Sequence, residues 1–194
     1  PRRRPANVLT SIGRVSDQKV ALFLEPVREG VSALEAILRE HADDTVFVML
    51  GGGDRGLEGR LMEIASRNGN FLYLRGYSEP LPDLLYRAGD LFLMPSSFEP
   101  CGISQMLAMR SGQPCVVHAV GGLKDTVRNG ANGFSFGGAT PRTQARGLVR
   151  TVNRALAMRH EEPGAWSRIC SNAAAARFSW DKAADAYISK LYAP

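Results

Sequence analysis

Residues 45–50 read TVFVML and are followed by three glycines at 51–53, and this stretch decides the fold. A continuous run of apolar and β-branched residues is typical of a strand that is covered on both faces, as in parallel sheets. The glycines end the strand, and the apolar pattern of residues 57–67 predicts a helix. A buried strand, a glycine turn and a helix together indicate one unit of an α/β fold.

The same alternation runs along the whole chain. Further strands are predicted at 8–12, 71–74, 91–94, 115–118 and 133–136. Helices are predicted at 20–40, where Pro26 interrupts or kinks the helix, and at 81–88, 103–110, 143–158, 166–176 and 180–191, the last with Ser179 as N-cap. Such βαβ units are right-handed and form a parallel sheet. We therefore expect an α/β fold, a Rossmann-like doubly wound parallel sheet with C-terminal helices, as one domain over residues 1–194 with a helical tail over about 141–194.

The composition is that of a globular protein. The 194 residues are 44% hydrophobic and 22% charged, which provides enough apolar material for a sizeable core. No run of about 18 apolar residues is present, so no membrane-spanning helix is expected. The three cysteines, Cys101, Cys115 and Cys170, are too few and too scattered for a disulfide framework or a metal cluster, and a cytoplasmic location is predicted.

The net charge of +5 favours an anionic ligand without naming one. The basic residues are spread along the chain, and the one basic run, at residues 2–4, is typical of a solvated tail. We therefore expect neither a nucleic acid nor a membrane as a partner.

The glycines also form a G-x-G-x-x-G pattern over residues 51–56, which is the signature of a dinucleotide site. However, the pattern follows the second strand rather than the first, and residues 71–75, about 20 positions on, hold no acidic residue for the ribose. The favoured interpretation is a tight strand-to-helix turn that lets the backbone pass close to another ligand.

Residues 95–103, PSSFEPCGI, carry the stronger signal for a ligand site. A strand stops at Pro95, and a helix opens just after Glu99. Free amide N–H groups and the positive end of the helix dipole form an anion site there, and Gly102 lets a phosphate approach the main chain. Because a carboxylate beside an anion is unfavourable, Glu99 is interpreted as an acceptor for the hydroxyls of a neutral group such as a sugar.

The run SFEPCGISQ at 97–105, followed by GGLKDTV at 121–127, resembles bacterial glycogen and starch synthases. GRVSDQK at 13–19 resembles their phosphate-binding loop, and FSW at 178–180 follows in the expected order. These enzymes are retaining glycosyltransferases of the two-domain GT-B fold. The resemblance covers nearly all of the chain but only their C-terminal, donor-binding half. The N-terminal acceptor domain and its Lys-x-Gly-Gly loop are absent, so the chain is expected to transfer little or no glucose by itself.

The resemblance also implies site residues. The catalytic ones are Arg14 and Lys19, which grip the donor diphosphate, and Glu99, which holds the transferred glucose. The substrate-binding ones are Tyr77, which stacks on the base, the segment Cys101, Gly102, Ile103 and Ser104, which meets the nucleotide, and Gly121 and Gly122, which flank the sugar pocket. Within that segment, Cys101 is interpreted as a small packed residue without a redox role.

Simpler interpretations stay open for several of these residues. Arg14 and Lys19 are also compatible with ordinary surface charges, and Glu99 with a charge at a helix N-terminus. Tyr77 is also compatible with a packed or rim aromatic. His118, at a strand end near the site, is interpreted as structural or rim.

The resemblance implies retaining transfer of glucose to an α-1,4-glucan, from ADP-glucose in preference to UDP-glucose. Since Arg14 and Lys19 can stabilise the leaving diphosphate and no Asp-x-Asp signature is present, we expect no metal and no other cofactor. The glucan acceptor is expected to bind through the missing domain. Two alternatives remain: a stand-alone nucleotide- or sugar-binding module, and another GT-B enzyme of the sucrose-phosphate synthase type. Leu107 argues against the second, because it stands where the wider superfamily often has a second glutamate.

Overall fold

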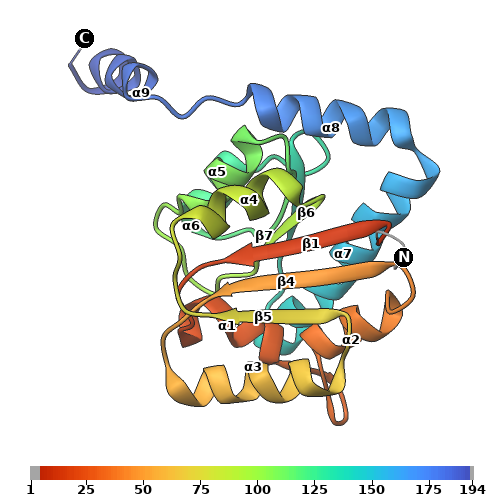
Figure 1. Ribbon diagram of the computed structural model, residues 1–194. Helices are drawn as coiled ribbons and strands as arrows, with labels where there is room; N and C mark the ends of the chain where they lie inside the picture. Colours follow the sequence, from red (N-terminus) through yellow and green to blue (C-terminus); the bar gives the residue numbers. More distant parts are fainter. Residues whose placement is uncertain (1–4, 193–194) are drawn as a thin grey trace.

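Six parallel strands form one sheet in the order β5-β4-β1-β6-β7-β8 in the computed structural model, which describes residues 5–192 (Figure 1). The strands are β1 (Asn7–Ile12), β4 (Thr45–Gly51), β5 (Phe71–Arg75), β6 (Leu91–Met94), β7 (Cys115–His118) and β8 (Gly133–Phe136). The chain adds β4 and β5 on one side of β1, then returns to place β6 on the other side of β1 and adds β7 and β8 beyond it. The predicted doubly wound parallel sheet is therefore confirmed, and β1 and β6 meet at its switch point.

Helices lie on both faces of this sheet (Figure 1). One face packs against α1 (Asp17–Leu24), α2 (Ala33–Glu40), α3 (Arg55–Arg67) and α7 (Pro141–Glu161). The other face packs against α4 (Pro80–Ala88), α5 (Ser104–Arg110) and α6 (Gly121–Thr126). Along β6, Leu91 and Leu93 enter the first core while Phe92 and Met94 enter the second, which explains why this strand is apolar throughout.

The structure confirms that Pro26 interrupts the helix predicted over 20–40, but the hairpin found at the interruption was not predicted. α1 ends at Leu24, and a short hairpin of β2 (Pro26–Arg28) and β3 (Val31–Ser32) precedes α2. Pro26 lacks the amide that a continuing helix needs, and Gly30 turns the hairpin with a positive φ of 63°. Ser32 then starts α2 with a capping box that involves Glu35.

The C-terminal helices are not all a tail. α7 belongs to the body, because Leu148 and Val152 are fully buried against the sheet core. α8 (Pro163–Ala175) packs on α5 and α7, whereas α9 (Trp180–Tyr187) and the π-helical turn Ile188–Tyr192 project from the body (Figure 1). Ser179 holds the predicted N-cap position of α9, but its side chain makes no capping hydrogen bond.

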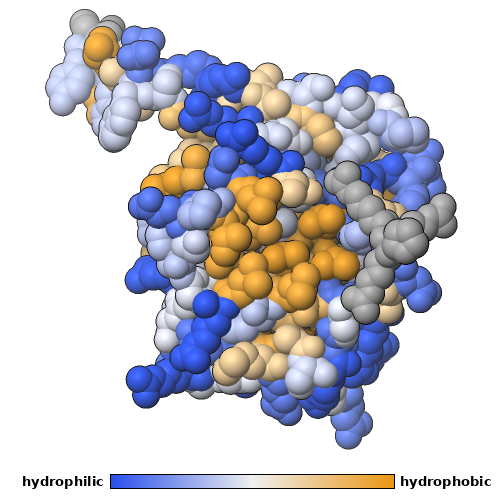
Figure 2. All heavy atoms as spheres, in the orientation of Figure 1, coloured by the Kyte–Doolittle hydropathy of each residue, from blue (hydrophilic) through white to orange (hydrophobic). Residues whose placement is uncertain are grey.

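Apolar side chains gather on the open part of the sheet face over β1, β4 and β5 (Figure 2). Parallel pairing places Val48 beside Leu72 and Leu50 beside Leu74, so these side chains share one face. Leu85 of α4 covers part of this face, but Leu72 on the edge strand is 50% exposed. Among the described elements, none lies over the outer part of β4 and β5 (Figure 1).

Within residues 5–192, no helix combines the length and the apolar character that crossing a bilayer requires. The same residues hold no cluster of three or more metal-ligating side chains, and their three cysteines are free. The basic run at 2–4 lies outside the described residues.

Candidate functional site

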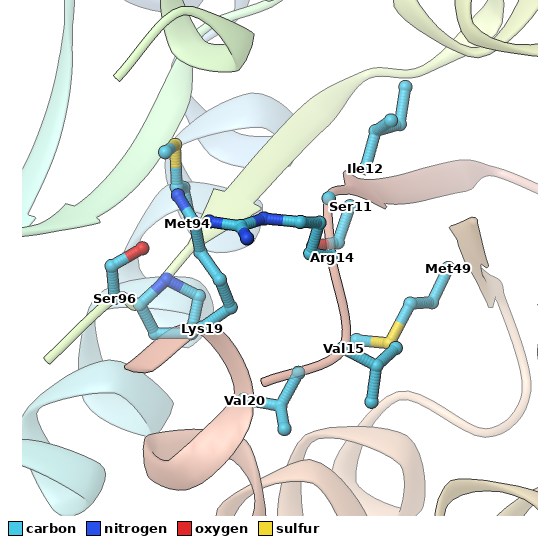
Figure 3. Close-up of a pocket in the computed structure, with 11 residues that line it drawn as sticks. Ser11, Ile12, Arg14, Val15, Lys19, Val20, Met49, Met94 and Ser96 are labelled. Atoms are coloured by element: carbon cyan, nitrogen blue, oxygen red, sulfur yellow. The ribbon is translucent and has the colours of Figure 1, made fainter. Parts of the chain in front are cut away.

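The switch point carries a small hollow at the carboxyl ends of β1 and β6 (Figure 3). Its lining includes Arg14 and Lys19 from the loop after β1 and the first turn of α1, and Met94 and Ser96 from the end of β6. Figure 3 shows the Arg14 and Lys19 side chains both extending toward Met94. The two predicted cations therefore meet at the edge of the sheet where doubly wound folds bind ligands.

Glu99 does not line this hollow itself, but it bonds to two residues that do, Lys19 and Ser96. Glu99 is 7% exposed, and its Oε2 atom pairs with the Lys19 ammonium. The Ser96 hydroxyl donates to the same oxygen at 3.2 Å. Since both donors that the described residues supply to this side chain reach Oε2, Oε1 keeps its capacity to accept another hydrogen bond.

Backbone contacts fix the approach of Lys19 to Glu99. The Ser97 amide donates to the Gln18 carbonyl at 2.9 Å, and the Gln18 side-chain amide donates to the Phe98 carbonyl at 2.6 Å. These bonds clamp the loop after β6 to the start of α1. The ion pair thus joins two segments that lie 80 residues apart in the sequence.

Arg14 differs from Lys19 in its surroundings. Its side chain is exposed, and it takes part in none of the ion pairs formed within residues 5–192. Lys19 and Glu99 largely neutralise one another, so Arg14 supplies the net positive charge of the hollow. A planar guanidinium with five N–H donors is well suited to phosphate oxygens.

The loop from Glu99 to Ser104 opens toward solvent at α5. Gly102 has a positive φ of 80°, and the Gln105 side chain donates to its carbonyl at 2.9 Å. Ile103 holds the N-cap position of α5 and is 65% exposed. Because the Ile103 side chain is aliphatic, it cannot accept a hydrogen bond from the amides of the first turn of α5. This turn begins at Ser104, where the nucleotide is predicted to bind. Cys101 is exposed, so the prediction that it is a packed residue is wrong.

Gly121 and Gly122 lie directly against this loop. A Cβ at Gly121 would stand 2.0 Å from the Glu99 carbonyl oxygen, and one at Gly122 would stand 2.4 Å from that of Cys101. The Gly122 amide also donates to the Glu99 carbonyl at 3.0 Å. The glycine pair therefore holds the backbone that carries Glu99, at the start of a helix, α6, that the sequence pattern did not predict.

Tyr77 follows β5 at the same edge of the sheet and is 79% exposed. It is therefore not a packed core aromatic, and its ring is free to stack on a ligand or a partner.

His118 is a contributor that sequence reasoning left without a role in the site. It is 4% exposed, stacks on Phe136 at 5.2 Å between ring centroids, and its Nδ1 lies 3.0 Å from the Ser96 carbonyl. Burial lowers the pKa of His118, and because a carbonyl oxygen can only accept, the Nδ1–H group is the donor. His118 thus supports Ser96, which in turn bonds to Glu99. The only sequence signal for this role was the position of His118 at the end of a strand.

The glycine run at 51–53 does not border open space for a cofactor. A Cβ at Gly51 would stand 1.9 Å from the Gly13 carbonyl oxygen, and one at Gly53 would stand 2.2 Å from that of Val15. The group that approaches these glycines most closely is therefore the chain's own loop after β1.

The strand order defines a Rossmann-like doubly wound domain, with two cations at its switch point. Residues 6–157 match the model of the family described as "Glycosyl transferases group 1", and the chain belongs to this family. Its structural neighbours are GT-B glycosyltransferases, so the expected fold class is confirmed.

Curated relatives of the chain include glycogen synthases. That of Rhodopirellula baltica is 34% identical over 196 residues, and the match covers 96% of this chain but 36% of the relative. That of Alkalilimnicola ehrlichii is 38% identical over 197 residues, covering 97% of this chain and 38% of the relative. The chain thus spans little more than a third of the length of these relatives, consistent with the expected C-terminal half of a GT-B enzyme.

A solved relative carries a nucleotide. The catalytic domain of starch synthase IV from Arabidopsis thaliana, bound to ADP and acarbose, superposes with a TM-score of 0.77 at 29% identity, over 96% of this chain and 38% of that one. The resemblance to glycogen and starch synthases is confirmed at the level of the glycosyltransferase family.

Proposed function

We propose that this chain is the donor-binding part of a retaining glucan synthase and that it binds a sugar nucleotide, ADP-glucose in preference to UDP-glucose. The observation that carries the proposal is that Arg14 and Lys19 line one hollow at the switch point and that Glu99 pairs with Lys19 there. The ADP in the starch synthase relative supports the choice of adenine nucleotide.

The charges at the hollow suit the departure of a diphosphate. As the bond between glucose and diphosphate breaks, negative charge grows on the leaving phosphate, and cations aimed at it stabilise the transition state more than the ground state. Arg14 binds phosphate oxygens as a planar fork. Lys19 has three N–H donors, so it can bind a phosphate oxygen while it keeps its bond to Glu99.

Glu99 then positions the sugar. Its Oε2 atom is held by Lys19 and Ser96, which fixes the carboxylate, and its Oε1 atom accepts from a glucose hydroxyl. The negative carboxylate also favours the oxocarbenium-like charge that develops on the sugar. In this arrangement Arg14 and Lys19 supply the positive charge, and neither a metal nor another cofactor takes part.

Transfer requires more than this chain. The glucan acceptor, an α-1,4-glucan, binds through the remaining part of a full-length enzyme, in keeping with the greater length of the relatives. The chain alone therefore binds the donor weakly and transfers little glucose.

The test is a calorimetric titration of the chain with ADP, ADP-glucose, UDP-glucose and NAD in the presence of EDTA. We expect ADP and ADP-glucose to bind, and Arg14→Ala to weaken ADP binding by more than about 1 kcal/mol, as the loss of a charge-assisted contact does. Arg150→Ala is the matched control, because Arg150 is an exposed arginine on α7 outside the site. Tighter binding of NAD than of ADP, or binding that Arg14→Ala leaves unchanged, would overturn the proposal.

A further inference from the structure

The loop that carries Arg14 is held by main-chain bonds to the glycine run. The Gly13 amide donates to the Leu50 carbonyl at 3.1 Å, and the Val15 amide donates to the Gly52 carbonyl at 3.0 Å. The Asp54 amide returns a bond to the Val15 carbonyl at 2.8 Å. Because Arg14 lies between two residues that are bonded in this way, the position of the glycine run sets where its side chain starts.

One buried carboxylate holds the glycine run in turn. Glu58 on α3 is 4% exposed, and its Oε1 accepts from the Gly53 amide at 2.8 Å. Its Oε2 pairs with the Arg75 Nε at 2.8 Å, at the end of β5. The Tyr73 hydroxyl adds a bond to the Gly51 carbonyl at 3.0 Å.

We propose that Glu58 is a positioning residue for donor binding, which fixes the glycine run and through it the loop that presents Arg14. This inference rests on the proposed function, since that function gives Arg14 its ligand. A carboxylate suits the task because it can join an amide and a guanidinium at once, and because Arg75 offsets the unfavourable burial of its charge. Within residues 5–192 the Glu58 carboxylate bonds to the Gly53 amide and to Arg75 but not to Arg14, so it acts on Arg14 through the backbone.

Glu35 provides a matched control on the same side of the sheet. It is 8% exposed, accepts from the Ser32 amide at 3.1 Å, and pairs with Arg39 at 3.4 Å. It therefore resembles Glu58 in burial and in partners, but it supports the start of α2 rather than the glycine run. Loss of either carboxylate should lower stability, whereas only loss of Glu58 should change the site.

The first experiment is a double-mutant cycle on ADP affinity. Glu58→Ala should weaken ADP binding about tenfold in the otherwise unchanged chain, because a displaced cation loses its contact. In the Arg14→Ala background the same change should have less than about a twofold effect, because the two residues act in series. Glu58→Gln, which keeps an acceptor for the Gly53 amide, should recover most of the affinity, and Glu35→Ala should leave it unchanged. Additive losses in the cycle, or an equal loss in Glu35→Ala, would overturn the inference.

The second experiment needs no ligand. Hydrogen exchange of the Val15 and Asp54 amides reports directly on the bonds between the two loops. We expect Glu58→Ala to accelerate exchange at both amides at least about tenfold, and Glu35→Ala to leave both unchanged. Unchanged exchange in Glu58→Ala would refute the positioning role. If exchange responds but the unchanged chain binds no ADP, the proposed function fails while the support of the loop by Glu58 stands.

Discussion

At the scale of single residues, the pairing of Lys19 with Glu99 shapes the candidate site most. A carboxylate with little solvent contact is stable as an anion only where a cation and hydrogen bonds replace water. Lys19 and Ser96 provide both. The same pair thus serves folding and, in our proposal, the orientation of the sugar.

The pairing predicts a stability effect that is not additive. Lys19→Met should destabilise the fold by roughly 2 kcal/mol, because it leaves the Glu99 charge without its cation. Adding Glu99→Gln should recover more than half of that loss, since no charge then remains. Urea denaturation of the two single variants and the double variant measures this. Independent, additive losses would show that the two side chains do not depend on one another.

His118 predicts a pH dependence of stability. Burial lowers the pKa of His118 in the folded state below its ordinary value near 6.5, so the unfolded chain binds the proton first. The contribution of His118 is therefore complete above that value and is lost as pH falls toward the folded pKa. In denaturant titrations, His118→Asn should flatten the decline of stability below pH 6.5, whereas His160→Asn, an exposed histidine, should leave the contribution of His118 in place. A variant His118→Asn with an unchanged pH profile would contradict the prediction.

The sequence predicted the chemical types of the site but not its contacts. Arg14, Lys19, Glu99 and the glycines could be recognised because each lies in a short motif. The Lys19–Glu99 pair and the contact of His118 with Ser96 join residues 80 and 22 positions apart. Such pairings depend on strand order, which local patterns do not encode, and the assigned ligand roles of these residues stay predictions.

At the scale of elements, glycine acts in two different ways on one strand–helix unit. Gly53 stands where any side chain would collide with the Val15 backbone. Gly59, within α3, has no atom within 4 Å of the place where a Cβ would lie. One glycine is required by packing, and the other only weakens its helix.

The two positions predict opposite effects of the same substitution. Gly53→Ala should destabilise the fold by roughly 2 kcal/mol, because the backbone of the loop after β1 must move away. Gly59→Ala should stabilise it by up to about 1 kcal/mol through helix propensity. Thermal denaturation of both variants measures the difference. Equal effects at the two sites would mean that the contact at Gly53 relaxes without strain.

Most elements could be predicted because their apolar periodicity is strong. The boundaries of β6, β7 and β8 agree with the predicted strands, whose residues are buried on both faces or close to it. Pro26 indicated the break before α2, but the hairpin was missed because its strands, of three and two residues, are too short to give an alternating apolar pattern. α6 was missed because its six residues place only Leu123 in the core, too few to give a period.

At the scale of the whole molecule, the sheet has one incompletely covered face. The prediction that both faces are covered is correct for Val48 and Leu50, which are 9% and 3% exposed, but Leu72 on the neighbouring strand is half exposed. β5 is also an edge strand, with one side unpaired within the described sheet. Strand order and coverage arise from the whole topology, so the pattern of a single strand could not reveal this.

The open face predicts weak self-association of the chain in solution. Exposed apolar area next to a free strand edge favours contact between copies. Leu72→Lys should reduce the concentration dependence of the sedimentation coefficient. Met62→Lys, at a 44% exposed methionine on α3 behind the sheet, should not. If both variants sediment like the unchanged chain, the open face does not mediate association.

The interlocked turns at Gly13–Val15 and Gly51–Gly53 have a consequence for divergence. The bonds between these turns join peptide groups, which are the same whatever side chains the chain carries. Two homologues can therefore differ at most positions and still hold the loop after β1 in the same place, provided that the places of closest backbone approach stay free of side chains.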